Sequence, residues 1–135
     1  MPSSNLTNTQ MNNILNLVLG VSSITGFNGQ SNLKLTTTAP TSASAGSELS
    51  GTGYTAGGQA ITFSSASGES SSGPTSPLSW TNGSGSGWSI VGFEVWDNAG
   101  AGVRWVWGTF SGQPISVANG NIFQISTNGI SVSWS

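Results

Sequence analysis

The sequence predicts a mainly β protein, a single antiparallel β-sandwich preceded by one N-terminal α-helix. From about residue 31 onward, short β-prone segments alternate with stretches rich in Gly, Pro, Asn and Ser, which is typical of a sandwich or barrel. Before that point there is one segment with helical periodicity. A chain of 135 residues is the size of one domain and is long enough to bury a core.

The predicted helix carries an apolar stripe with the spacing of one helix face. Its members are Met11, Ile14, Leu15, Val18 and Leu19. Asn8 or Thr9 is a suitable N-cap, and Gly20 is a suitable stop. The stripe needs a partner surface, which is either the sheet of its own domain or another subunit. We therefore expect residues 1–30 to form an N-terminal arm and docking helix, and residues 31–135 to form the β-sandwich domain.

Seven segments are expected as strands: 33–37, 59–63, 89–96, 103–110, 115–117, 122–126 and 130–134. Asn-Gly pairs at 119–120 and 128–129 favour the positive φ angles of tight turns. Residues 64–87 are dominated by Ser, Gly and Pro, which predicts a long surface loop interrupted by a short edge segment near 78–80.

The firmest tertiary expectation is a hairpin between residues 89–96 and 103–110. The first strand alternates, with one set of side chains expected in the core: Val91, Phe93 and Val95. The other face carries Ile90, Gly92, Glu94 and Trp96. Residues 97–102 form the turn, and the return strand is apolar on both faces, which predicts a central strand or one that faces a neighbouring molecule.

Composition excludes several classes of function. Without Cys or His, the chain offers no zinc finger, haem ligand, Ser-His-Asp triad or thiol chemistry, and we expect no cofactor. Its two cations, Lys34 and Arg104, are too few to neutralise several phosphates, so nucleic acid is not an expected partner. No apolar run reaches the roughly 20 residues of a membrane span, and the first residues lack the positive charge of a secretory signal. We expect a non-membrane protein synthesised in the cytoplasm.

Charged residues make up only 4% of the chain, against about 25% in a typical soluble domain. Such a neutral surface is poorly protected from self-association, which favours a life within an assembly.

Acid-base catalysis would have to use the four carboxylates: Glu48, Glu69, Glu94 and Asp97. Glu94 and Asp97 are an odd number of residues apart on a strand and are expected to point to opposite faces. We therefore expect no enzyme, and a small glycosidase dependent on Glu94 stays as a minor alternative. A calcium site at Asp97 and Asn98 would have a thin ligand set.

Tryptophan is unusually frequent, with six residues: Trp80, Trp88, Trp96, Trp105, Trp107 and Trp134. Trp supplies bulk for cores and for subunit contacts, where aromatic residues are enriched. An exposed Trp can also stack on a sugar ring. Trp96 is the expected exposed one, because it shares a strand face with Gly92 and Glu94.

Several motifs follow one another in the order found in one known family. They are the helix 11–20, Leu-Lys-Leu-Thr-Thr-Thr-Ala-Pro-Thr at 33–41, Gly-Ser-Glu-Leu-Ser-Gly at 46–51, Gly-Tyr at 53–54, Gln-Ala-Ile-Thr-Phe at 59–63, Gly-Phe-Glu-Val-Trp-Asp at 92–97 and Val-Ala-Asn-Gly-Asn-Ile-Phe-Gln-Ile at 117–125. In this order the chain resembles small virion proteins of tailed bacteriophages, labelled tail fibre or capsid decoration proteins. The resemblance covers nearly the whole chain. It implies a jelly-roll β-sandwich behind an N-terminal helix, with no catalytic residues. The sequence departs from the family pattern at Gly57-Gly58, where relatives carry a basic residue, and in its higher Trp content.

The resemblance implies a non-enzymatic phage structural protein. We expect a capsid decoration or cement protein, a homo-oligomer and specifically a trimer, bound to the phage major capsid protein on the capsid surface. The expected docking residues are Met11, Ile14, Leu15 and Val18, and the expected subunit contacts are Trp96, Trp105 and Trp107. The alternative is a tail-fibre or receptor-binding module whose exposed Trp residues recognise host surface glycans.

Overall fold

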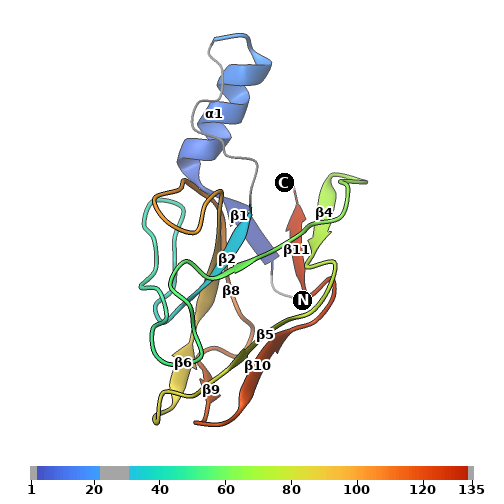
Figure 1. The fold of residues 1–135 in the computed structure, drawn as a ribbon. Helices are drawn as coiled ribbons and strands as arrows, with labels where there is room; N and C mark the ends of the chain where they lie inside the picture. Colours follow the sequence, from blue (N-terminus) through green and yellow to red (C-terminus); the bar gives the residue numbers. More distant parts are fainter. Residues whose placement is uncertain (1–2, 22–30, 134–135) are drawn as a thin grey trace.

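A computed structural model describes residues 3–21 and 31–133 of the chain. Its elements are β1 (Ser3–Leu6), α1 (Asn8–Val18), β2 (Asn32–Thr36), β3 (Gln59–Ala60), β4 (Ser70–Gly73), β5 (Leu78–Thr81), β6 (Trp88–Ile90), β7 (Gly92–Trp96), β8 (Arg104–Thr109), β9 (Ile115–Val117), β10 (Ile122–Ile125) and β11 (Ile130–Ser133). The predicted class, mainly β with one N-terminal helix, is confirmed (Figure 1).

The main sheet has seven strands in the order β3-β2-β7-β8-β1-β11-β4. Two short ladders, β5 with β10 and β6 with β9, lie at the end of the molecule opposite the helix (Figure 1). Among the pairings of described strands, β1 with β11 is parallel and the others are antiparallel. The helix therefore extends beyond one end of the sheet, and the second layer of the sandwich lies at the other.

The core joins the main sheet to the two ladders. Phe93 and Leu35 are fully buried on the sheet, and Phe123 is buried on β10. The ring of Phe110 lies 5.3 Å from that of Phe93 and 5.4 Å from that of Phe123, centroid to centroid, and so connects the layers. Aromatic pairs at these distances add to the stabilisation that area burial provides.

The predicted hairpin is present as β7 and β8, but the single strand predicted over 89–96 is wrong, because residues 88–90 form β6 and pair with β9 in a separate ladder. Val95 pairs with Val106 across the two strands, and the register shifts between Val95 and Trp96. The Asp97 carboxylate closes the turn, because its Oδ1 accepts the backbone N–H of Val103 at 2.6 Å. Phe93 and Val95 are buried as expected. β8 occupies the middle of the seven-stranded sheet, which agrees with its apolar character on both faces.

The prediction of a long loop over residues 64–87 is wrong at β4, whereas the short edge segment expected near 78–80 is present as β5. β4 is Ser-Ser-Ser-Gly and pairs with β11 from Ser70 to Gly73. β4 forms a strand because its backbone pairs with β11, not because its side chains favour strands. The serine-rich composition of the segment therefore did not predict it. β5 pairs with β10 and buries Trp80 against Phe123.

The N-terminal arm also contributes a strand that the sequence did not indicate. β1 lies between β8 and β11, with Leu6 opposite Val106. It belongs to the main sheet of the sandwich, although the sequence suggested that residues 1–30 lie apart from it.

The predicted Asn-Gly turns are present, with Gly120 at φ 84° and Asn128 at φ 58°. Each connects strands of different sheets, so neither forms a hairpin. Trp134, predicted to end the last strand, lies outside the residues that the structure describes.

The helix begins one residue earlier than predicted, because the N-cap is Thr7 rather than Asn8 or Thr9. The Thr7 hydroxyl accepts the N–H of Gln10 at 3.3 Å and donates to the carbonyl of Arg104 at 3.2 Å. The Thr7 N–H donates to the carbonyl of Trp105 at 3.0 Å. One residue therefore caps the helix and fastens its first turn to β8. Gly20, at φ 70°, follows the C-cap Leu19, as expected of a stop.

Candidate functional site

The first candidate surface is the exposed apolar face of α1. Met11, Leu15 and Val18 are 43%, 55% and 75% exposed, and Ile14 is half-buried. The sequence placed these four residues and Leu19 on one stripe; with Leu19, which is also exposed, we call them the helix stripe. Leu17 and Val21 are exposed as well, and the periodicity did not include them.

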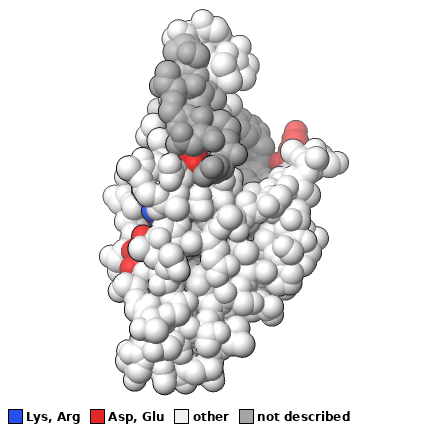
Figure 2. Space-filling view, in the orientation of Figure 1, with Lys and Arg blue, Asp and Glu red and all other residues white. Residues whose placement is uncertain are grey.

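The helix stripe is not covered by the described part of its own sheet. Gln10 is the one buried residue of α1. Residues 3–21 carry no charged side chain, and the part of the projection that Figure 2 leaves uncovered is uncharged. Of the two partners that the sequence left open for the stripe, a neighbouring molecule is the one that this geometry favours. Contiguous exposed apolar patches of this kind mark interaction sites.

The three tryptophans expected at subunit contacts are half-buried: Trp96, Trp105 and Trp107. Trp96, expected to be the exposed one, is held on two sides. Its Nε1 donates to Glu94 Oε2 at 2.9 Å, and Lys34 Nζ lies 4.2 Å from its ring centroid, within cation–π distance. Trp96 and Trp105 line one pocket, whereas Trp107 pairs with Glu94 in the β7–β8 register.

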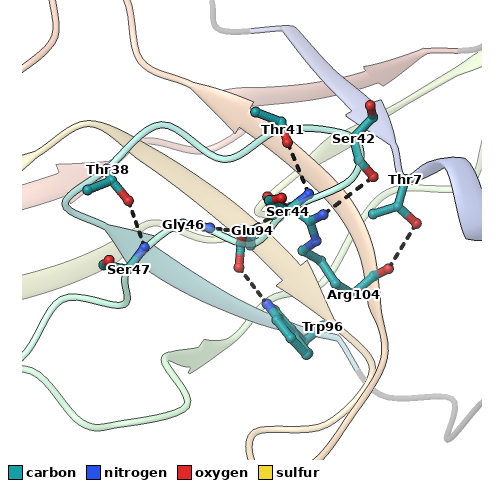
Figure 3. Close-up of polar contacts among 10 residues, drawn as sticks. All are labelled: Thr7, Thr38, Thr41, Ser42, Ser44, Gly46, Ser47, Glu94, Trp96 and Arg104. Atoms are coloured by element: carbon teal, nitrogen blue, oxygen red, sulfur yellow. Dashed lines mark hydrogen bonds and ion pairs between the residues drawn. The ribbon is translucent and has the colours of Figure 1, made fainter.

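A buried ion pair that the sequence reading missed lies beside Trp96 (Figure 3). Glu94 Oε1 accepts from Arg104 Nη1 at 3.0 Å and from the Gly46 N–H at 2.8 Å. Arg104 also donates from Nη1 to the Ser44 carbonyl at 2.9 Å and from Nη2 to the Ser42 carbonyl at 3.5 Å. We call this group the Glu94–Arg104 clasp, because it fastens the segment 42–46 onto the sheet.

The Glu94–Arg104 clasp contains the carboxylate on which the alternative function of a small glycosidase depends. The Glu94 side chain is 2% exposed, and both of its oxygens accept hydrogen bonds from protein donors. A carboxylate this deeply buried is not within reach of a substrate in solution in this conformation. The arrangement is that of a structural pair.

A second polar cluster joins Glu48, Tyr54 and Lys34. Glu48 Oε1 accepts from the Tyr54 hydroxyl at 2.9 Å and from the Gly57 N–H at 2.6 Å, and Lys34 Nζ lies 3.9 Å from Oε2. Burial, the largest cause, raises the pKa of the Tyr54 hydroxyl far above its ordinary value of 10.0, and the Glu48 carboxylate adds to the rise. Tyr54 thus stays neutral and acts as a hydrogen-bond bridge, since it also accepts the Leu35 N–H at 3.2 Å.

The calcium alternative finds no support at the β7–β8 turn. Asn98 Oδ1 accepts the N–H of Gly100 at 3.0 Å, and Asp97 Oδ1 accepts that of Val103, so both side chains build the turn. Within residues 3–21 and 31–133, no three His, Cys, Asp or Glu side chains lie close enough to hold a metal. The other carboxylate oxygen, Asp97 Oδ2, is buried and without a hydrogen-bond partner.

Asp97 also lines a pocket of about 240 Å³. Its lining includes Val95, Val106 and Leu6, which pair across β7, β8 and β1, together with Phe63, Trp96 and Trp105. The sequence pointed to Trp96 as a candidate for sugar stacking but gave no sign of this hollow.

The comparisons with known proteins give one family. Residues 5–133 match the model of a family described as Podophage GP4 fiber I protein gp80. This match spans nearly the whole chain and agrees with the predicted phage virion structural protein, of the fibre type rather than the capsid decoration type. No curated protein matches the chain. No helix of the described residues is long and apolar enough to cross a membrane.

Proposed function

The chain belongs to the Podophage GP4 fiber I protein gp80 family, and from that premise we propose that it is a non-enzymatic subunit of a phage fibre. In this role the helix stripe joins copies of the chain, and the β-sandwich is the part presented outward. The observation that carries the proposal is the family match together with an uncharged helix that leaves its apolar face uncovered.

The length of α1 supports an assembly role. With 11 residues, the helix is about 16 Å long at 1.5 Å per residue. Isolated helices shorter than about 12–15 residues are marginal in water, so α1 gains most of its stability from packing. The described part of the chain contributes little of this packing, because four of the five stripe residues are exposed.

The helix stripe is suited to packing against the same stripe on other copies of the chain. The stripe has no charge that a partner must complement, and an uncharged apolar face can pack against copies of itself around a symmetry axis. We propose a homo-oligomer, specifically a trimer. Trp96, Trp105 and Trp107 are half-buried, and contact between subunits through their exposed parts stays a prediction.

The outward role is recognition of host surface glycans. The two cations of the chain are engaged in the clasp and in the Glu48 cluster, so the surface is polar but nearly uncharged. Such a surface favours neutral, hydroxyl-rich partners over nucleic acid or an anionic membrane.

Capsid decoration would use the same features differently. In that case the helix stripe would dock on the phage major capsid protein, and the chain would lie on the capsid surface. No contact in the described residues favours this over self-association, and the family description favours the fibre.

Two charges on the helix stripe test the assembly. We expect Leu15→Asp combined with Val18→Asp to convert the oligomer to a monomer in sedimentation experiments and to prevent its incorporation into particles. Burying two carboxylates in an apolar contact is strongly unfavourable.

The matched control is Asn12→Asp with Asn16→Asp, which adds the same charges to the polar side of the same helix and should leave the oligomer intact. A wild-type chain that sediments as a monomer at every concentration would contradict the proposal, as would a stripe variant that assembles normally.

A further inference from the structure

A second pocket, of about 360 Å³, lies at the base of α1, where the helix meets the sheet. It is lined by residues 7–10, Ser42, Ala43, Val103 and Arg104, and we call it the helix-base pocket. None of these residues belongs to the helix stripe, so packing of the stripe against other copies does not use them. The volume lies within the roughly 300–1,000 Å³ of sites for small ligands.

Gln10 brings an unused donor to the helix-base pocket. It is 1% exposed, and its Oε1 accepts the Asn13 amide at 3.0 Å, but its own Nε2 donates to no group of the described residues. The N–H of Thr7, which a glutamine at this position of a capping box would bind, donates to the Trp105 carbonyl instead. Because buried polar groups nearly always have a partner, the Gln10 amide requires an acceptor from outside the chain.

The helix supplies a backbone donor at the same place. The N–H groups of the first turn of a helix have no partner within the helix. That of Asn8 donates to the Ser42 carbonyl at 3.4 Å, and that of Gln10 donates to the Thr7 hydroxyl at 3.3 Å. The N–H of Thr9 is left, on an exposed residue that lines the pocket. The pocket therefore offers two N–H donors to an acceptor oxygen.

Arg104 adds no uncompensated charge to the pocket. Its Nη1 lies 3.0 Å from Glu94 Oε1, and its remaining contacts are to the carbonyls of Ser42 and Ser44 (Figure 3). The first turn of α1 holds no acidic residue either, so the partial positive charge of a helix N-terminus remains. Such a site suits an uncharged acceptor such as a carbonyl oxygen, and a carboxylate is the alternative that the test must exclude.

The rest of the lining is both apolar and polar. Ala43 and Val103 are exposed and give the pocket a small apolar surface, against which a methyl group can be buried. The side chains of Asn8, Thr9 and Ser42 supply donors and acceptors for hydroxyl groups. A ligand that carries a carbonyl, a methyl group and several hydroxyls therefore finds partners for each.

We propose that the helix-base pocket binds the N-acetyl group of an amino sugar in a surface glycan, with the acetyl carbonyl accepting from the Gln10 amide and the Thr9 N–H. The acetyl methyl lies against Ala43 and Val103, and the ring hydroxyls meet the polar side chains of the first turn. The assignment rests on the proposed fibre function, and it names the class of glycan that the fibre recognises.

The test titrates the full chain with N-acetylglucosamine, N-acetylgalactosamine, glucose, galactose and sodium acetate, and saturation-transfer NMR reports binding. We expect at least one N-acetyl sugar to bind, with its strongest signal on the acetyl methyl, and its parent hexose to bind at least ten-fold more weakly. Acetate is the probe for an anion at the helix N-terminus, and we expect it not to bind.

Two alanines of one segment provide a matched pair of variants. Ala43 and Ala45 are both exposed, and of the two only Ala43 lines the pocket. Ala43→Phe should fill the pocket and weaken binding of the N-acetyl sugar at least ten-fold, whereas Ala45→Phe should bind as the wild type does. Gln10→Glu keeps an oxygen for Asn13 and removes the donor, and it should weaken binding in the same way. If Gln10→Glu does not melt as the wild type does, Ala43→Phe decides the question.

Four results would overturn the pocket assignment: neither N-acetyl sugar binds, the parent hexoses bind as tightly, acetate binds while the N-acetyl sugars do not, or Ala43→Phe binds as the wild type does. The fibre function is scored separately, by the position of the chain on particles. Fibres that carry the chain while the pocket binds no sugar would leave the fibre function standing and remove only this site.

Discussion

At the scale of single residues, the Glu94 carboxylate determines how the segment 42–46 lies on the sheet. It accepts three hydrogen bonds, and its partner Arg104 reaches two carbonyls of that segment. Removing one member of a buried ion pair costs more than the pair contributes, because the other charge is left without a partner. The clasp is therefore sensitive to the loss of either side chain.

We expect Glu94→Gln to lower the free energy of unfolding by about 3–5 kcal/mol, measured by urea denaturation. The exposed Glu69→Gln serves as the control and should change it by no more than about 0.5 kcal/mol. The double variant Glu94→Gln, Arg104→Met should lose less than Glu94→Gln alone, since it buries no unpaired charge. Equal stability of Glu94→Gln and the wild type would show that the clasp does not hold the segment.

Gly58 lies in the turn just before β3, where the resemblance implied a basic residue. Its φ of +77° is one that side chains rarely adopt, and an added Cβ would meet the carbonyl oxygen of Leu33 on the neighbouring strand. A basic residue at this position would require a different backbone. The Gly57-Gly58 pair thus reflects close packing of the turn against β2.

Gly58→Ala is expected to destabilise the protein by about 1–3 kcal/mol from strain alone, with a further loss from the contact. Gly112→Ala is the matched control: its φ is +71°, but no atom lies within 4 Å of the added Cβ. Thermal unfolding should show the larger loss for Gly58→Ala. Equal losses of stability in the two variants would mean that the structure accommodates an added Cβ beside the Leu33 carbonyl oxygen without an energetic cost.

The raised pKa of the Tyr54 hydroxyl predicts that the stability of the protein depends on pH. Burial raises the pKa of its hydroxyl in the folded state above the ordinary value of 10.0, so the fold binds a proton that the unfolded chain releases. Its contribution is fully present below about pH 10 and is lost as the pH rises further.

Urea unfolding at pH 8 and above pH 10 checks this, with Tyr54→Phe as the reference variant that lacks the titrating hydroxyl. The variant should lose about 1–3 kcal/mol near neutral pH, since the Leu35 N–H and Glu48 lose a partner, and its stability should fall less steeply in alkali. As the one tyrosine of the chain, Tyr54 can also be titrated by its absorbance. A midpoint near pH 10 in the folded protein would contradict its burial.

At the scale of elements, the sequence predicted the strands whose own side chains alternate. The hairpin of β7 and β8 follows from Phe93 and Val95 on one face and from a turn rich in Asn, Ala and Gly. β4 was missed because serine has little preference for strands, and its pairing partner β11 lies 60 residues away in the chain. β1 was missed for a similar reason: a four-residue strand is stabilised by β8 and β11 rather than by its own pattern.

The site was less predictable than the fold. The helix stripe was found by periodicity, but its exposure depends on where Thr7 fastens the helix to β8. The clasp joins Gly46 to residues 94 and 104, and the pocket joins β1, β7, β8 and β11. Such groupings depend on strand order and register, which no local pattern encodes.

Because β1 is a central strand, we expect removal of residues 1–20 to damage the sandwich as well as the assembly. The deletion would leave β8 and β11 without a shared neighbour, and we predict loss of a cooperative thermal transition in circular dichroism. Point variants of the helix stripe should melt as the wild type does. A truncated chain with an unchanged melting curve would mean that β1 adds nothing to the sheet.

At the scale of the whole molecule, the low charge and the uncovered helix favour a role within an assembly of copies of the chain. Four of the six charged side chains are paired with one another: Lys34 with Glu48, and Arg104 with Glu94. The surface is left nearly neutral, and the helix that projects from the sheet carries exposed apolar side chains and no charge (Figure 1). These features fit a protein that works while attached to other copies, as a fibre subunit does.

The position of the chain on the virion tests this account most directly. Gold-labelled antibody against the β-sandwich, viewed on whole particles by electron microscopy, should mark the fibres and leave the head shell unlabelled. Particles carrying the Leu15→Asp, Val18→Asp variant should lose that label, and those carrying the Asn12→Asp, Asn16→Asp control should keep it. Label spread over the head shell, in register with the capsid lattice, would contradict the fibre assignment and establish capsid decoration instead.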